Sequence, residues 1–425
     1  MTAWGTTMGQ SNFDRVSKVQ NQAARIITGA MKSTPIQELE ATTGLQSMED
    51  RRDTKILIQA AKFKRLKDHP MRDRFSQPTK GRLKRGSFIH QSRILERRHQ
   101  DILDHTPKEI PRCTSVPAWS KETFPIIRPY VPGVGPRESQ SDTVKMSLTL
   151  DYLHSHYPNN LWTHVYTDGS AEDAVRNGGA GVYIQYPEGR EDRLSLATGR
   201  YSTNYKAEAE ALKTAAAHLK DRPFTSHNIV FLTDALSVLQ ALQSTKNLEL
   251  NDLSEVLNSL CCNHIVVLQW VPSHCNIPGN EAADLLAKEG TTKEQEDRST
   301  SYSEAKTIIK AKQQSKWKDH HPQHNKSDPY YLLTRREQVT IFRLRTGHNR
   351  LNHHLFNKLR IGHTEQCPCS TGSQTTEHLL QYCPLYEALR WKHWPDHTPL
   401  AQQLYGGLED LRRTAAFIGE TGISI

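Results

Sequence analysis

The sequence has no long apolar run and few cysteines. No stretch approaches the roughly 18 consecutive apolar residues that a membrane-spanning helix needs, and the first residues lack the apolar core of a secretory signal. The seven cysteines among 425 residues are unevenly spaced, which argues against a disulfide framework and indicates reduced thiols. We therefore expect a chain that crosses no membrane, is not secreted and works inside the cell, in the cytoplasm or the nucleus.

Length and proline content indicate several compact units. A chain of 425 residues exceeds the usual size of one domain, so two or three are expected. Seven prolines between Pro107 and Pro136 predict a linker, because proline interrupts both helices and central strands. The pattern divides the chain into a basic helical region at 1–106, a Pro-rich linker at 107–160, an α/β domain at 161–290 and a basic helical tail at 291–425.

Charge follows this division. Residues 1–120 hold 22 Lys and Arg against 12 Asp and Glu, residues 161–290 hold 10 against 16, and residues 291–425 hold 19 against 14. Basic flanks around an acidic centre fit a nucleic acid held by the flanks, with carboxylates at the centre binding metal. Lys and Arg that only keep exposed helices soluble would give the same counts, so charge alone favours neither interpretation.

Three helices are predicted between residues 12 and 68. The first ends at Gly29, a natural C-terminal stop. Its apolar residues at helical spacing are Phe13, Val16, Val19, Ala23 and Ile26. Thr34 is expected to cap the second helix, which Gly44 ends, and Ser47 to cap the third. The apolar face of the third helix includes Ile56, Ala60, Phe63 and Leu66.

From Leu161 the pattern changes to short strands with turns, followed by alternating helices and strands. The predicted strands are 162–167, 180–186, 192–198, 229–233 and 264–270. The predicted helices are 203–220, 235–244, 251–261 and 279–289. Three antiparallel strands followed by strand-helix units predict an α/β fold with a mixed five-stranded sheet and flanking helices.

Two aspartates stand where predicted strands end. Asp168 follows the first strand in Tyr-Thr-Asp-Gly-Ser, and Asp234 follows the fourth in Phe-Leu-Thr-Asp. Parallel strands would bring both to the sheet edge at which α/β proteins place their sites. Either residue alone is more simply explained as a helix cap or a turn residue.

Two helices carry further acidic residues. Glu208 shares helical spacing with the apolar face that packs on the sheet, whereas Glu210 points away from it. A carboxylate on a buried face needs a partner, for which a metal ion is one candidate. On the last predicted helix, Asn280 and Asp284 share one side because they are four residues apart. Several converging carboxylates are what two-metal phosphodiester hydrolysis requires, since hard divalent cations prefer oxygen ligands.

Four motifs in this order and spacing resemble the type 1 ribonuclease H family. They are Thr167-Asp168-Gly169-Ser170, the run from Thr203 to Glu208, Leu232-Thr233-Asp234, and Trp270 to His274 followed ten residues later by Asp284. The resemblance covers residues 161–290, and four ordered motifs are far more specific than one.

The resemblance implies activity, metal and site residues. The activity is endonucleolytic hydrolysis of the RNA strand of an RNA/DNA hybrid, with two Mg²⁺ ions, or Mn²⁺ in their place. The metal ligands implied are Asp168, Glu208, Asp234 and Asp284. His274 matches a histidine in a mobile loop that assists proton transfer or product release, and Asn204 matches a contact to the minor groove.

The sequence also departs from the family pattern. Ala235 and Leu236 replace a polar pair that often follows the third carboxylate. Some family members have a basic segment, the basic handle, in the region that corresponds to residues 245–255. Here this region holds Glu249, Asp252 and Glu255 with only Lys246, so the basic handle is missing. Weak binding of the hybrid by the domain itself is expected, with the basic flanks as a substitute.

Near the C-terminus, Cys367, Cys369, His378 and Cys383 have the spacing C-x-C, eight residues, H, four residues, C. Three thiolates and one imidazole suit a closed tetrahedral Zn²⁺ site, and free buried cysteines are the alternative. His363 is a weaker additional ligand.

The flanks resemble non-LTR retrotransposon reverse transcriptases. Residues 19–30 with 34–40 look like the helical region after the polymerase, and residues 343–348 with 376–378 look like the tail. The chain contains no adjacent Asp-Asp pair and has no room for a polymerase palm. The resemblance implies the C-terminal part of such a polyprotein, with a reverse transcriptase or an element ribonucleoprotein as a partner.

Two other functions fit the same residues. One is a catalytically silent remnant that only binds nucleic acid. The other is a nuclease of the same fold that acts on duplex DNA, although the context of Asn204 and the fourth carboxylate favour hybrids, through recognition of the 2′-hydroxyl.

Overall fold

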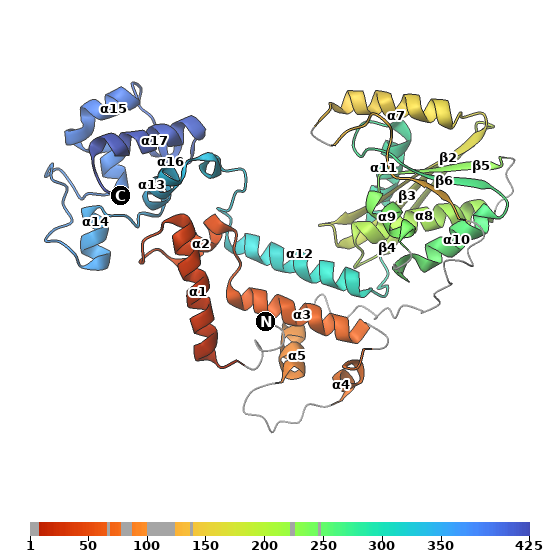
Figure 1. Ribbon diagram of the computed structural model, residues 1–425, viewed down its shortest axis with the longest axis horizontal. Coiled ribbons are helices and arrows are strands. Elements are labelled where there is room, and N and C mark those ends of the chain that lie inside the picture. The colour runs from red at the N-terminus through yellow and green to blue at the C-terminus, as the bar shows by residue number, and fades with distance from the viewer. Residues whose placement is uncertain are drawn as a thin grey trace. The chain divides into compact units, whose positions relative to one another are not determined.

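The computed structural model describes residues 8–65, 69–77, 87–99, 124–136, 139–221, 226–244 and 248–425 (Figure 1). The chain forms two compact units. One is residues 54–312, and the other combines the described residues up to Asp53 with residues 313–425. Within the described ranges, no helix combines the length and the apolar character of a membrane span.

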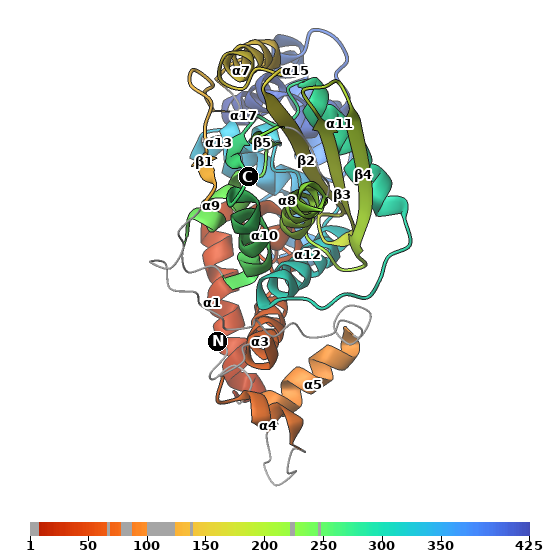
Figure 2. The same cartoon turned by 90° about the vertical axis from the view of Figure 1, so that its right-hand side faces the viewer.

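A six-stranded mixed sheet forms the centre of the 54–312 unit (Figure 2). In spatial order its strands are β1 (Ile126–Arg128), β6 (Ile265–Trp270), β5 (Asn228–Thr233), β2 (Trp162–Glu172), β3 (Arg176–Gln185) and β4 (Glu191–Gly199). The β2-β3-β4 pairs are antiparallel, and the β2-β5, β5-β6 and β1-β6 pairs are parallel. The mixed sheet and the five predicted strands are confirmed.

The predicted number of strands was wrong by one. The additional strand, β1, lies inside the segment expected to be a linker. Pro125 and Pro129 stand immediately outside its two ends, and an edge strand tolerates proline there because half of its backbone groups need no ladder partner. Three residues between prolines are too short to produce a strand pattern in the sequence.

Helices cover both faces of the sheet (Figure 1). α8 (Asn204–Lys220), α9 (Leu236–Gln243) and α10 (Asn251–Cys261) pack on one face around a core that includes Leu212, Phe231 and Leu257. α7 (Asp142–His156) and α11 (Pro278–Thr292) cover the other face. The four predicted helices are confirmed as α8 to α11.

α7 was not predicted, because it also lies in the expected linker. Its buried stripe consists of Lys145, Thr149 and Leu153, spaced four residues apart. Two of these residues are polar, so the stripe gives almost no apolar periodicity. The helix begins where Ser141 accepts a hydrogen bond from the Val144 backbone N–H.

Helices that precede and follow the sheet in the sequence complete the 54–312 unit. α3 (Met48–Arg65), α4 (Arg72–Ser76), α5 (Phe88–Arg98) and α12 (Tyr302–His320) contribute residues here. Ile56, Leu57, Ala61, Leu95, Ala305 and Ile309 form a common apolar cluster. Arg65, which is buried, donates to Thr300 O at 3.1 Å and to Thr300 Oγ1 at 3.0 Å.

Helices make up most of the other unit. They are α1 (Gln10–Thr28), α2 (Ile36–Thr43), α13 (Arg335–Thr346), α14 (Asn352–His354), α15 (Glu387–His393), α16 (Leu400–Tyr405) and α17 (Leu408–Thr421). Gly29 and Gly44 end α1 and α2 with φ of 68° and 66°, as predicted. Ser47 caps α3 as predicted, since it accepts the Asp50 N–H at 3.1 Å.

Three details of the N-terminal helices differ from the sequence predictions. α1 buries Phe13, Ala24 and Thr28, whereas Val19 and Ile26 of the predicted apolar face are 69% and 66% exposed. The helix therefore buries Phe13 of the predicted face but otherwise packs through Ala24 and Thr28 instead of Val19 and Ile26. Pro35 is the N-cap of α2, so Thr34 does not cap it. Of the predicted face of α3, Ile56 and Ala60 are buried, Phe63 is partly exposed, and Leu66 lies outside the described residues.

Candidate active site

Asp168 and Asp234 lie side by side at the edge where the parallel pairing of β2 and β5 ends. Thr167 of β2 and Thr233 of β5 are the last register partners of this pair, and each aspartate follows one of them. The prediction that the first strand ends at residue 167 was wrong, because β2 continues to Glu172 and Asp168 pairs with Gly181 of β3. Asp168 is buried, and the backbone N–H of Gly169 donates to its Oδ1 at 2.7 Å.

Glu208 reaches this edge from α8. A Cβ at position 169 would overlap the backbone of Ala207 and Glu208, so only glycine lets the first turns of α8 lie directly against β2. Thr203 caps α8 by accepting the Lys206 N–H at 3.3 Å, which fixes where the helix begins. Glu210 is on the other side and pairs with Lys213 at 3.5 Å.

Asp284 comes from α11, on the face of the sheet opposite α8. Gly181 of β3 allows this approach, because a Cβ there would overlap the carbonyl oxygen of Ala283. Lys288, one helical turn later, donates to Asp284 Oδ2 at 2.6 Å. Sequence reasoning missed Lys288, although its i,i+4 spacing from Asp284 was a usable signal. Asn280, one turn earlier, is buried, and its Oδ1 has no hydrogen-bond partner in the described part of the chain.

The charges of these groups act on one another. Burial raises the pKa of Asp168 to about 8, and repulsion by the charges of Asp234, Asp284 and Glu208 adds to this effect. The hydrogen bond from the Gly169 N–H acts in the opposite direction and lowers the pKa. Burial and the charge of Asp234 raise the pKa of Glu208 to about 8. Burial also raises the pKa of Asp234, while the neighbouring His274 lowers it. The structure therefore brings all four predicted carboxylates together, and the surroundings favour the neutral forms of Asp168, Glu208 and Asp234.

The two other predicted site residues lie beside the carboxylates. His274 is exposed in the loop between β6 and α11, near enough to Asp234 for its charge to act there. Asn204 is exposed as the first residue of α8. Ala235 is the N-cap of α9 and makes no side-chain capping bond.

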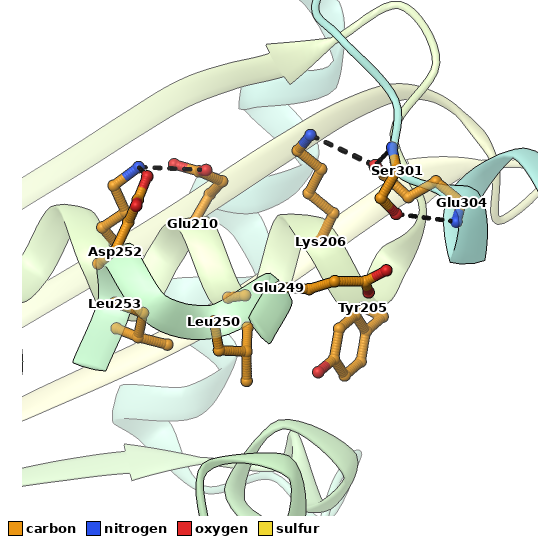
Figure 3. Close-up of a pocket in the computed structure, with 11 residues that line it drawn as sticks. Tyr205, Lys206, Glu210, Glu249, Leu250, Asp252, Leu253, Ser301 and Glu304 are labelled. Carbon is orange, nitrogen blue, oxygen red and sulfur yellow. Dashed lines mark hydrogen bonds and ion pairs between the residues drawn. The ribbon is translucent and has the colours of Figure 1, made fainter. Parts of the chain in front are cut away.

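Acidic residues occupy the region of the missing basic handle. Glu249 and Asp252 line a cavity of about 90 Å³ beside α8, together with Tyr205 and Leu253 (Figure 3). Lys246 lies outside the described residues. Figure 3 also shows Lys206 of α8 directed toward Glu304 at the start of α12, and their charged groups are 3.5 Å apart.

The Cys/His cluster lies in the other unit. Sγ of Cys367 is 3.6 Å from Sγ of Cys383, and Sγ of Cys369 is 3.2 Å from Nε2 of His378. All four ligand atoms lie within 4.8 Å of one another. Ligands bound tetrahedrally to one Zn²⁺ are about 3.3–3.8 Å apart, so the donor set and its spacing fit the ion. His363 is exposed and is not part of this group.

Comparison with known proteins identifies the class. The ribonuclease H family model matches residues 162–292. Ribonuclease HI of Synechocystis sp. is 30% identical over 138 residues, which cover 29% of this chain and 83% of that protein. The chain therefore belongs to the ribonuclease H family. It is a ribonuclease H-type hydrolase of phosphodiester bonds, with its family domain in the sheet-containing unit.

Two solved structures are also similar. Ribonuclease H1 of the halophilic archaeon Halobacterium salinarum NRC-1 is 23% identical, with a TM-score of 0.26, and the match covers 30% of this chain and 96% of that one. LC11 ribonuclease H1 in complex with an RNA/DNA hybrid is 20% identical, with a TM-score of 0.26, and the match covers 31% and 99%.

Proposed function

We propose that this protein hydrolyses the RNA strand of RNA/DNA hybrids endonucleolytically, with two Mg²⁺ ions, or Mn²⁺ in their place, held by Asp168, Glu208, Asp234 and Asp284. The observation that carries the proposal is the convergence of these carboxylates from β2, α8, β5 and α11 at one edge of the sheet. Oxygen donors of this charge fit hard divalent cations. The solved hybrid complex of the similar LC11 enzyme is consistent with the same substrate class.

Each site residue has a proposed task. When bound, the metal ions activate a water molecule and stabilise the charge that develops on the scissile phosphate. The four carboxylates orient the ions, and the close packing of α8 on Gly169 keeps Glu208 in place. His274, beside Asp234, transfers a proton or assists product release, and Asn204 contacts the minor groove of the hybrid.

A substrate comparison tests this function. Full-length protein with Mg²⁺ is incubated with matched hybrid, duplex RNA and duplex DNA, each labelled on one strand. We expect internal cleavage of the RNA strand of the hybrid, abolished by EDTA. Cleavage of duplex DNA instead would support the alternative nuclease of the same fold. Hybrid binding without cleavage would identify the catalytically silent remnant.

The basic flanks are proposed to hold nucleic acid. The acidic domain at 161–290 has 10 Lys and Arg against 16 Asp and Glu, so it should attract a polyanion weakly on its own. Binding that neutralises phosphates releases counterions and weakens steeply with salt. Changing the exposed Arg15, Lys18, Arg51 and Lys55 to Gln in the whole chain should lower both the affinity and its salt dependence. Unchanged values would place the binding surface elsewhere.

The Cys/His cluster is proposed to bind one Zn²⁺. Its support is the donor set and the spacing of the four ligand atoms. Metal analysis of purified protein should give one zinc per chain, and Cys383→Ser should lose it. Cys261→Ser offers a matched control, because Cys261 lies outside this cluster. A zinc-free wild-type protein would leave these residues as packed thiols.

The cellular context is also a proposal. The motifs at 19–30 and 343–348 support an origin in a retrotransposon polyprotein, with a reverse transcriptase or an element ribonucleoprotein as partner. Such a protein would act in the cytoplasm or the nucleus. Co-purification of the tagged chain with a reverse transcriptase from cells would test the partner, and its absence from such complexes would count against it.

A further inference from the structure

The loop that carries His274 has an unusual backbone. His274 and Asn276 both adopt left-handed conformations, with φ of 53° and 57°. Residues other than glycine occupy this region rarely and stay there only when neighbouring structure holds them. The buried residues of the loop are Val271, Pro272, Cys275 and Ile277. Cys275 is the buried residue between the two left-handed positions, so it anchors the turn.

The first turn of α7 is next to this anchor. Sγ of Cys275 is 3.2 Å from the carbonyl oxygen of Ser273 and 3.9 Å from Oδ1 of Asp142. Nζ of Lys145 lies 4.0 Å from the same Asp142 oxygen, and the Lys145 side chain is only 3% exposed. A buried ammonium group costs free energy unless partners surround it, which makes a purely space-filling role for Lys145 unfavourable.

α7 is itself fixed to the strand that leads into the loop. Leu153 and Tyr157 share an apolar cluster with Val271 and Ile277. The Tyr157 hydroxyl donates to Gln269 Oε1 of β6 at 3.1 Å, and Nε2 of Gln269 donates to the carbonyl oxygen of Tyr130 at 2.9 Å. β1 pairs with β6 directly. Residues 124–136 and 139–157 thus contact β6 and the ends of the loop, although they lie outside the family match at 162–292.

We propose that α7 is a positioning element of the active site, in which Lys145 and Asp142 hold Cys275 and thereby keep His274 beside Asp234. This inference rests on the proposed function and assigns a role to a segment that precedes the family domain. In this role Asp142 and Lys145 are positioning residues and not metal ligands. They act through the loop, so their contribution should depend on His274.

A double-mutant cycle in the full-length chain tests this dependence. Lys145→Met keeps most of the buried stem and removes the charge. It should lower kcat for the hybrid about tenfold, because small displacements of a catalytic group are costly, and leave KM unchanged. In the His274→Ala background, Lys145→Met should cause no further loss. The matched control is Asp151→Asn on the exposed side of α7, which should have no effect.

Cys275 provides a second pair of variants. Cys275→Ser keeps a donor toward Ser273 O and Asp142 and should retain most of the activity. Cys275→Val keeps the bulk but loses the donor, so it should behave like Lys145→Met. Equal kcat values for these two variants, a normal kcat for Lys145→Met, or the same loss with and without His274 would overturn the inference.

Hydrogen exchange separates this inference from the proposed function. In Lys145→Met, the amides of residues 273–277 should exchange about tenfold faster than in wild type, whereas Asp151→Asn should leave them unchanged. If wild type cleaves no hybrid, the proposed function fails while the exchange rates still decide the role of α7. Unchanged exchange in Lys145→Met would refute that role even in an active enzyme.

Discussion

Nζ of Lys288 lies 2.6 Å from Oδ2 of Asp284, one helical turn before it on α11. The ammonium group lies beside a proposed metal ligand, and the hydrogen bond to Asp284, with the charges of Asp284 and Asp168, raises the pKa of Lys288. A divalent cation bound by Asp284 in the proposed site would displace part of this contact, so we expect Lys288 to compete with the metal.

Lys288→Met should lower the Mg²⁺ concentration needed for half-maximal cleavage by about two- to fivefold, the size expected of a solvent-exposed ion pair. Lys293→Met is the matched control, since Lys293 pairs with Glu289 at 3.1 Å with the same i,i+4 spacing. A Mg²⁺ titration of cleavage rates would show the shift. An unchanged or higher requirement in Lys288→Met would mean that the lysine does not compete.

Gly169→Ala should abolish cleavage and destabilise the fold, because a Cβ there collides with the backbone of Ala207 and Glu208. α8 would have to move away from β2 and take Glu208 with it. Gly419→Ala serves as the control, since a Cβ at that position meets no atom within 4 Å. Thermal unfolding and cleavage assays on both variants measure the difference, and a fully active Gly169→Ala protein would contradict the packing described.

The two glutamates of α8 should respond differently to neutralisation. Glu208→Gln should lose nearly all Mg²⁺-dependent cleavage, because the residue lies among the site carboxylates. Glu210→Gln should be nearly silent, because that residue pairs with Lys213 on the other side of the helix. The assay is cleavage at saturating Mg²⁺, and reversed effects would show that the other glutamate serves the site.

Stability without metal should fall as the pH rises. The folded-state pKa values of Asp168 and Glu208, about 8, exceed their ordinary values of 3.8 and 4.5. Protonation of these two carboxyl groups therefore contributes to the free energy of unfolding. This contribution is complete below about pH 4 and is lost as the pH rises toward 8. In EDTA the unfolding temperature should drop by several degrees between about pH 5 and 8, and Mg²⁺ should restore it by binding the folded state.

The matching control is Asp168→Asn, which removes one of the repelling charges and should flatten the dependence on pH. Differential scanning calorimetry across this range, with and without Mg²⁺, provides the values. A wild-type unfolding temperature that rises with pH in EDTA would contradict the repulsion among the carboxylates.

The sequence predicted those site residues that lie on strands and helices with a clear apolar periodicity. Asp234 follows the end of β5, and Asp168 lies within β2 at the point where its parallel pairing with β5 ends, so the two were correctly predicted to be neighbours although β2 is longer than expected. Glu208 follows from the spacing of the apolar face of α8. α7 escaped prediction because Lys145 and Thr149 stand where apolar residues would mark a buried stripe. Its relation to the His274 loop depends on tertiary packing, which local spacing does not encode.

In α1 an apolar stripe was visible in the sequence, but it predicted the wrong packed face. α1 has a clear apolar stripe, yet Val19 and Ile26 are exposed while Ala24 and Thr28 are buried. Apolar periodicity identified the helix and its end at Gly29, but the choice of the packed face depends on partners such as Leu39 and Phe342, distant in sequence.

The most direct test of the proposed two-metal site is hybrid cleavage by wild type, Asp168→Asn and Asp234→Asn, measured with Mg²⁺ on protein whose folding is verified by calorimetry. Both variants should fold and still bind hybrid. Each should cleave about a thousandfold more slowly than wild type, since a metal ion contributes several kcal/mol to transition-state stabilisation. Cleavage near the wild-type rate with an unaltered Mg²⁺ requirement in either variant would contradict the assignment of these carboxylates as metal ligands.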